Sequence, residues 1–132
     1  MLQQHFHAII WIDHHQAKVF CFNASDVDRD VIRPRDPTVH LHHKANTIGS
    51  GHAPVDKDYL RRITESVFKA GVIMIVGPAN AKTELAAYIA EHAPLLSARV
   101  STVEAADHPS DGELVALARK FFRADDRMRT PG

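Results

Sequence analysis

The segment VIMIVGPANAKTELAAYIAEHA, residues 72–93, decides the fold. Its first five residues are all apolar and mostly β-branched, which predicts a fully buried strand over residues 72–76. GPAN then turns the chain, and Asn80 is predicted to cap a helix that Pro94 ends. A buried strand that leads directly into a helix is typical of α/β folds with parallel strands.

A second apolar run, HAIIWID, predicts another buried strand, over Phe6–Asp13. A short polar turn separates it from AKVFCFN, residues 17–23, so these two strands are expected to form a hairpin. A third strand is predicted over Val27–Arg33. Its charges and Pro34 favour a position near the edge of the sheet.

The remaining elements follow from helical periodicity and capping signals. A helix is predicted between Asp56, as N-cap, and Gly71, as C-terminal stop. ARVSTVEA, residues 98–105, predicts the last strand. Ser110 and Glu113 match a capping box that starts the last helix. The apolar face of the first helix is expected to comprise Tyr59, Leu60, Ile63, Val67 and Phe68.

This order, β-β-β-α-β-α-β-α, predicts a five-stranded mixed sheet with helices on its faces. The two apolar runs should lie side by side at its centre, and the helical crossovers imply parallel pairing of the later strands. That layout is the ribonuclease H-like three-layer architecture. We expect one domain over residues 1–132, a flexible loop over 38–55 and a frayed tail over 125–132.

The composition indicates a globular protein without a global cationic field. The chain has 132 residues and a formal net charge of zero with histidine neutral, and its ten histidines can add positive charge at mildly acidic pH. The single cysteine, Cys21, lies in an apolar run and is expected to be buried. No run is long enough for a membrane span, and MLQQHFH lacks the features of a signal peptide. The sequence therefore predicts a cytoplasmic protein with no membrane partner and no cofactor.

The stretch TVHLHHKANTIGSGHAP, residues 38–54, concentrates histidine and glycine where no core can form. In an extended chain His40 and His42 point the same way, a spacing that can chelate zinc or nickel. His52 is a second chemical candidate, as the catalytic group of a small hydrolase. A metal site, a hydrolytic site and an exposed loop all remain open from these residues.

Three other motifs are weaker. Asp13 ends the first strand, where an acid can help to hold magnesium, but the second central strand ends in Gly77-Pro78 rather than in a further acid. Asp13 is therefore interpreted as a turn residue, with catalysis as the alternative. GPANAK lacks the second glycine of a phosphate loop and predicts a tight turn. Ser50 lacks the strand–serine–helix context of a nucleophile elbow.

Two segments together carry a family resemblance. FHAIIWIDHHQAKVFCFN, followed by AGVIMIVGPANAKTELAAYI, resembles the middle domain of class I peptide-chain release factors of eukaryotes and archaea and of Pelota rescue factors. Gly77, Lys82, Thr83 and Glu84 match the family's strand-to-helix turn, and the resemblance covers about Phe6 to Ala93. The chain looks like the small stand-alone bacterial "translational machinery" or release-factor-like proteins.

The resemblance implies a ribonuclease H-like fold and a functional tip between the third strand and the first long helix. Release factors carry Gly-Gly-Gln there, whereas this chain reads TIGSGH over residues 47–52, without the glutamine. The resemblance therefore implies a ribosome- or tRNA-associated factor for rescue, hibernation or stress. The missing glutamine implies that this factor lacks the usual peptidyl-tRNA hydrolysis, and we also expect no codon-reading domain. The RNA-contacting residues are expected to be His42, His43, Lys44, Gly49, Gly51, His52, Lys57, Arg61 and Arg62.

Two alternatives accompany this reading. One is a small hydrolase or metal-binding protein that uses the histidine-rich loop, and the other is an interaction module without an RNA role. Binding to RNA that weakens with salt separates the translation factor from the interaction module. Activity lost on His52→Ala, with binding retained, indicates the hydrolase.

Overall fold

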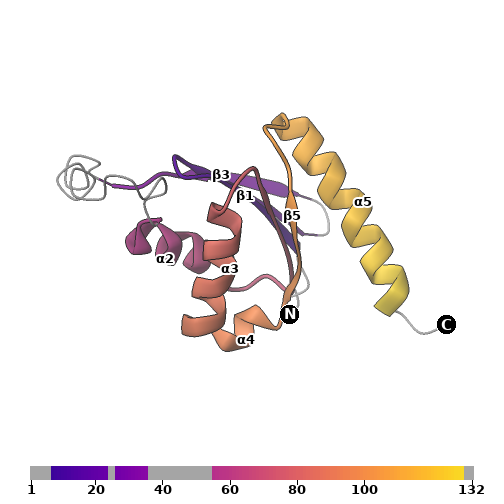
Figure 1. The fold of residues 1–132 in the computed structure, drawn as a ribbon. Helices are drawn as coiled ribbons and strands as arrows, with labels where there is room; N and C mark the ends of the chain where they lie inside the picture. Colours follow the sequence, from indigo (N-terminus) through magenta and orange to yellow (C-terminus); the bar gives the residue numbers. More distant parts are fainter. Residues whose placement is uncertain (1–6, 24–25, 36–54, 130–132) are drawn as a thin grey trace.

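The structure, a computed structural model, describes residues 7–23, 26–35 and 55–129, and for residues 125–129 the backbone alone. Its helices and strands form one layered α/β unit (Figure 1). The elements are β1 (His7–Ile12), β2 (Ala17–Phe22), β3 (Val27–Ile32), α2 (Lys57–Ser66), β4 (Val72–Gly77), α3 (Ala81–His92), α4 (Pro94–Ser97), β5 (Val100–Ala105) and α5 (Asp111–Arg129).

The five strands form one mixed sheet in the order β3-β2-β1-β4-β5. β1, β2 and β3 pair antiparallel as a meander, whereas β1 with β4 and β4 with β5 pair parallel. The mixed sheet, its central pair of apolar strands and the edge position of the third strand are confirmed. Parallel pairing follows because α2 and α3 return the chain to the same end of the sheet before β4 and β5 begin.

Each face of the sheet is covered by helices, and the alternation of side chains along β1 divides the core in two. Ile10 and Ile12 point to the face covered by α2 and α3, and Ile9 and Trp11 point to the face covered by α5. β4 is buried at every position because it lies in the middle of the sheet with helices on both sides. None of the helices within the described ranges has the length and apolarity to cross a bilayer.

α2 ends earlier than the sequence indicates. The prediction placed its end at Gly71, but the helix stops at Ser66 and Val67 is its C-cap. The Ser66 hydroxyl donates to the Ile63 carbonyl, and the Val67 amide closes a tighter turn on Thr64, so the helical hydrogen-bond ladder ends there. Phe68, predicted to lie on the buried face, is instead 59% exposed.

The following connections also differ in detail from the prediction. Asn80 occupies the N-cap position of α3, but its side chain makes no capping hydrogen bond. Pro94 follows the end of α3 as predicted, and it also begins the short helix α4. Proline is tolerated there because the first amide of a helix has no intrahelical acceptor. β5 therefore starts at Val100, two residues later than expected.

The capping box of α5 is confirmed. The Glu113 amide donates to the Ser110 hydroxyl at 3.1 Å, and the Ser110 amide donates to the Glu113 carboxylate at 2.8 Å. The helix then buries Leu114, Ala118 and Phe122 against the sheet. It continues to Arg129 and so extends into the segment 125–132 that the sequence predicts to fray.

A candidate nucleic-acid interface at the base of the 36–54 segment

β3 ends at Ile32, the described chain continues to Arg35, and it resumes at Val55, directly before α2. Residues 36–54 lie outside the described residues, so most of the predicted contact residues cannot be placed. These are His42, His43, Lys44, Gly49, Gly51 and His52, together with the metal-ligand candidate His40. The structure does describe the residues next to this segment. We call them its base, and they are Arg35, Val55, Asp58, Arg62 and Glu84.

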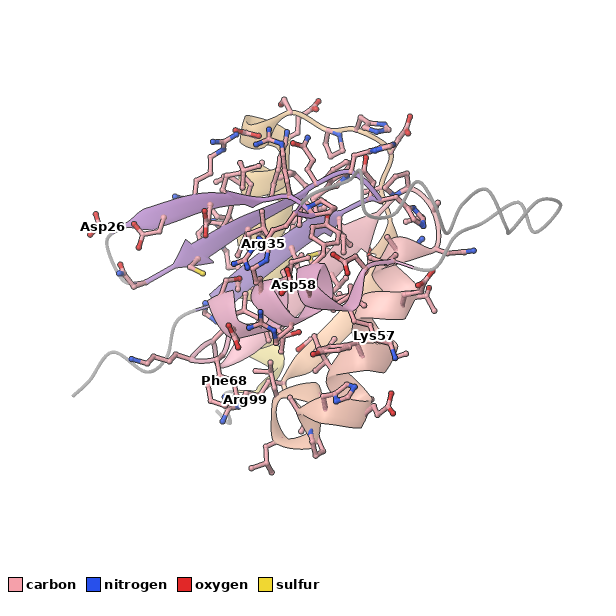
Figure 2. All side chains as sticks on the ribbon, turned by 90° about the vertical axis from the view of Figure 1, so that its left-hand side faces the viewer. Asp26, Arg35, Lys57, Asp58, Phe68 and Arg99 are labelled. Atoms are coloured by element: carbon pink, nitrogen blue, oxygen red, sulfur yellow. The ribbon has the colours of Figure 1, made fainter. Side chains whose placement is uncertain are left out.

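Asp58, in the first turn of α2, is the centre of this base. Its carboxylate accepts hydrogen bonds from Arg61 at 2.6 Å and from Arg62 at 3.1 Å, and lies 3.8 Å from the guanidinium of Arg35. Hydrogen bonds from Arg61 and Arg62 hold the pKa of Asp58 below its usual value. Figure 2 shows Arg35 and Asp58 next to each other on this face. The residue before the segment is thereby tied to the helix after it.

Two of the predicted RNA contacts, Arg61 and Arg62, are therefore already engaged with protein. Arg61 also pairs with Glu65 at 3.1 Å, and Arg62 also donates to the Arg33 carbonyl. Arg61 is half-exposed and can still reach a ligand with its outer face, whereas the side chain of Arg62 is only 21% exposed. Lys57, the third predicted contact in α2, is exposed at the helix start.

The other side of the base is held by α3. Glu84 accepts a hydrogen bond from the Val55 amide at 2.9 Å, and Val55 itself is buried. Asp56 then caps α2 by accepting from the Asp58 amide, which confirms its predicted role. Glu84 belongs to the turn that carries the family resemblance, so one function of that turn is to fix where the 36–54 segment ends.

Gly77 sets the strand spacing at the same end of the sheet. A Cβ atom on Gly77 would lie 2.2 Å from the carbonyl oxygen of Ile12 in β1. Only glycine allows the two backbones to approach this closely. The turn that follows, with α3 and Glu84 behind it, is positioned by this contact.

Asp13 forms a turn, as the sequence indicates. One of its carboxylate oxygens accepts from the His15 amide at 2.7 Å and from the Gln16 amide at 2.9 Å, which closes the hairpin between β1 and β2. Its carbonyl accepts from the hydroxyl of the buried Tyr59 at 3.0 Å. Burial and the negative charge of Asp13 raise the pKa of Tyr59 far above its usual range, so this hydroxyl remains a donor.

Sequence reasoning missed the residues that face Asp13 from β5 and its following loop. His108 places Nε2 3.9 Å from the second oxygen of Asp13 and Nδ1 3.0 Å from the carboxylate of Asp107. Trp11 fixes this loop by donating from its indole nitrogen to the Asp107 carbonyl. Trp11 and Asp107 are 96 positions apart in the sequence, and no local pattern signals their contact or that of His108 with Asp13.

The described residues contain no group of three side chains suited to hold a metal ion. One oxygen of the Asp13 carboxylate accepts from amides of its own turn, and the other faces the ring of His108. The histidine pair His40 and His42 is outside the described residues, so that prediction is not tested here.

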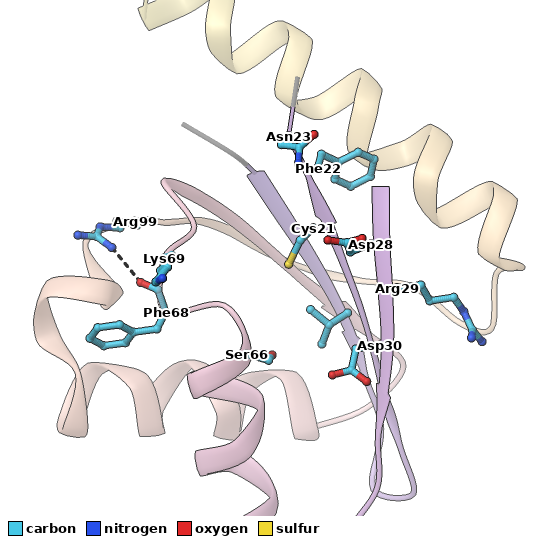
Figure 3. A pocket seen from close by; sticks show the side chains of 11 residues that line it. Cys21, Phe22, Asn23, Asp28, Arg29, Asp30, Ser66, Phe68, Lys69 and Arg99 are labelled. Carbon is cyan, nitrogen blue, oxygen red and sulfur yellow. Dashed lines mark hydrogen bonds between the residues drawn. The ribbon is translucent and has the colours of Figure 1, made fainter. Parts of the chain in front are cut away.

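A groove of about 900 Å³ lies at the opposite end of α2, over the outer strands (Figure 3). Asp28 and Asp30 line it from β3, Cys21 lines it from β2, and Lys69 and Arg99 approach from the helical side. Burial, with the negative charge of the two aspartates, raises the pKa of the Cys21 thiol, so it packs as a small apolar group rather than as a nucleophile. Charges of both signs line this groove, which does not mark it as a phosphate site.

Comparison with known proteins agrees on the fold. No family model and no curated protein matches the chain. The Pelota protein of Thermoplasma acidophilum matches with a TM-score of 0.53 and 15% identity, over 82% of this chain and 30% of its own. An archaeal translation termination factor matches with a TM-score of 0.57 and 10% identity, over 96% and 40%. The Pelota protein of Archaeoglobus fulgidus matches with a TM-score of 0.54 and 11% identity, over 87% of this chain and 31% of its own.

The fold resembles that of the release-factor and Pelota middle domain. At these identities the likeness concerns the fold alone. The chain spans between 30% and 40% of the length of these proteins, so it corresponds to one part of each. The predicted resemblance is confirmed for the fold.

Proposed function

We propose that this protein is a translation-related factor of ribonuclease H-like fold that associates with the ribosome or with tRNA in rescue, hibernation or stress. The likeness to Pelota and to a translation termination factor supports the general class. The observation that carries the proposal is the anchored base of the 36–54 segment. Arg35, Asp58 and Arg62 bind its two sides together, and Glu84 holds its end.

An anchored base gives a loop a defined direction. The segment has nineteen residues and carries Lys44 and all three histidines that we expect to contact RNA, His42, His43 and His52. A segment of that length and polarity, with both flanking residues held by α2 and α3, is suited to enter a narrow RNA-lined site. Because the glutamine of Gly-Gly-Gln is absent, we propose that it does so without hydrolysing peptidyl-tRNA by the usual mechanism.

Co-sedimentation with purified ribosomes through a sucrose cushion tests the proposal. We expect wild-type protein to co-sediment at low salt, and Lys44→Ala with Arg61→Ala to weaken binding and flatten its salt dependence by about one unit of slope per lost phosphate contact. Lys69→Ala removes an exposed lysine beyond the other end of α2 and serves as the control. Failure of the wild-type protein to bind ribosomes or tRNA at any salt concentration would sink the proposal.

A hydrolysis assay addresses the alternative function. With peptidyl-tRNA as substrate, the proposed factor releases no peptide above the uncatalysed rate. If peptide is released, and His52→Ala abolishes release while ribosome binding persists, the protein is a hydrolase that uses its histidine-rich loop.

A further inference from the structure

α5 carries a concentration of positive charge that the base of the 36–54 segment does not share. Between residues 119 and 129 the helix has five cationic residues against two carboxylates, whereas its first turn holds the acids Asp111 and Glu113. Arg119, Lys120 and Arg123 are all exposed. Arg123 lies four positions after Arg119 and three after Lys120, so the three share one side of the helix and span about 6 Å along its axis.

These cations differ from those around Asp58 and Asp111, which have carboxylate partners. Lys18 and Arg29 are both neutralised by Asp111. Arg35, Arg61 and Arg62 are likewise paired to Asp58.

In the part of α5 whose side chains the structure describes, the three cations after Ala118 have no carboxylate partner. Arg119 lies over the ring of Phe22 at 5.7 Å, which leaves its charge uncompensated. Among the residues that the structure describes, no carboxylate pairs with Lys120 or Arg123. The molecule as a whole has zero net charge, so these unpaired cations form a local positive patch. Such a patch attracts a polyanion.

We propose that Arg119, Lys120 and Arg123 form a second RNA-binding surface, which contacts the phosphate backbone without reading sequence. A basic helix can also bind anionic lipid, but it needs an apolar face to insert. The apolar face of α5, comprising Leu114, Ala118 and Phe122, is already packed against the sheet. A phosphate backbone requires only the cationic side, so RNA is the partner that fits.

The position of this surface adds to the proposed function, on which the inference rests. α5 covers the face of the sheet opposite to α2 and α3, and it lies on the far side of the molecule from the base of the 36–54 segment (Figure 1). The two surfaces therefore cannot contact the same short stretch of RNA. A factor that binds through both contacts two RNA elements at once, which raises its effective affinity through linkage.

Binding of the full chain to a short labelled RNA duplex, of about two helical turns, tests the inference by fluorescence anisotropy. We expect Lys120→Gln with Arg123→Gln to weaken binding about tenfold or more near 0.1 M salt. The slope of log K against log salt should fall by about two, one unit per cation. Arg119 is left intact because it packs on Phe22. The charge-conserving variant Lys120→Arg with Arg123→Lys should bind like the wild type.

A matched pair of single variants separates the surface from net charge. Lys120→Gln and Lys69→Gln each remove one exposed cation, and only the former should weaken duplex binding. Equal effects, an unchanged double variant, or a wild type that binds anionic vesicles but not RNA would each overturn the inference. Loop-dependent ribosome binding without duplex binding overturns this inference alone, whereas duplex binding without ribosome or tRNA binding overturns the proposed function alone.

Discussion

Gly77 occupies the position where the two central strands come closest. Its missing side chain lets the carbonyl of Ile12 lie where a Cβ atom would otherwise be, at 2.2 Å. The obstacle is backbone on a buried strand, which cannot move aside as the end of a flexible side chain can. The glycine therefore sets the spacing of β1 and β4 and, through the turn that follows, the position of α3.

Gly77→Ala should lower the free energy of unfolding by about 3 kcal/mol or more, because the added methyl group forces β1 and β4 apart. Urea unfolding followed by circular dichroism measures this change. Gly112→Ala is the matched control. Its Cβ would meet only the Ser110 hydroxyl at 4.0 Å, so it should be neutral or stabilise α5 by about 0.5 kcal/mol. Equal effects of the two substitutions would contradict the steric argument.

Asp58 links stability to pH. Its pKa is lowered in the folded protein, from a usual value of 3.8, by hydrogen bonds from Arg61 and Arg62. A depressed pKa means that the ionised form stabilises the fold above the unfolded-state pKa, and that this contribution disappears as the pH falls through the folded-state value. The stabilisation is therefore present at neutral pH and is lost in acid.

Asp58→Asn should accordingly have a lower melting temperature than the wild type at pH 7, and the difference should shrink as the pH falls below about 4. Thermal unfolding from pH 7 to pH 2.5 gives the comparison. Asp28→Asn, which removes an exposed carboxylate from edge strand β3, controls for net charge and should show no such convergence. A difference that stays constant with pH would show that the charge of Asp58 is not responsible.

The Val55 amide, directly before α2, donates a hydrogen bond to Glu84 in α3. Glu84→Ala leaves a buried amide without its acceptor and should cost about 1 to 3 kcal/mol. Glu84→Gln keeps an acceptor oxygen and should cost less. Hydrogen exchange of the Val55 amide, measured by NMR, should accelerate in the alanine variant and remain protected in the glutamine variant. Equal protection in all three proteins would mean that Glu84 does not hold this end of the segment.

Elements with a local signal were predictable from the sequence. The apolar runs of β1 and β4 and the reciprocal cap of Ser110 and Glu113 are written in adjacent residues, and all are found. The end of α2 was not predictable from Gly71. It depends on the Ser66 side chain competing for a backbone carbonyl, which propensities do not capture.

The site divides in the same way. Asp58 and Arg62 are four residues apart on a predicted helix, a spacing that favours an ion pair, and the structure shows this ion pair. The contacts of Arg35 with Asp58 and of His108 with Asp13 join separate elements. They depend on how strands and helices meet in three dimensions, so they could not be read from one sequence.

The whole molecule has sixteen cationic residues, sixteen acidic residues and ten histidines. Histidine gains its charge between about pH 8 and pH 5, so the net charge turns positive as the pH falls. We expect ribosome or tRNA binding to tighten between pH 7.5 and pH 6, with a steeper salt dependence at the lower pH. Co-sedimentation at matched ionic strength measures this. Binding that is unchanged between these pH values would mean that the histidines do not face the RNA.

The parallel pairing of β1 with β4 has a consequence for how the protein is made. β1 is synthesised before its parallel partner β4, which follows more than sixty residues later along the chain. Until then the meander of β1, β2 and β3 exposes one open edge and two uncovered apolar faces. Folding must wait for a late, long-range closure, which is slow. A nascent chain that stalls before residue 72 should therefore be prone to aggregate, whereas one that includes α5 has every element needed to complete the sheet.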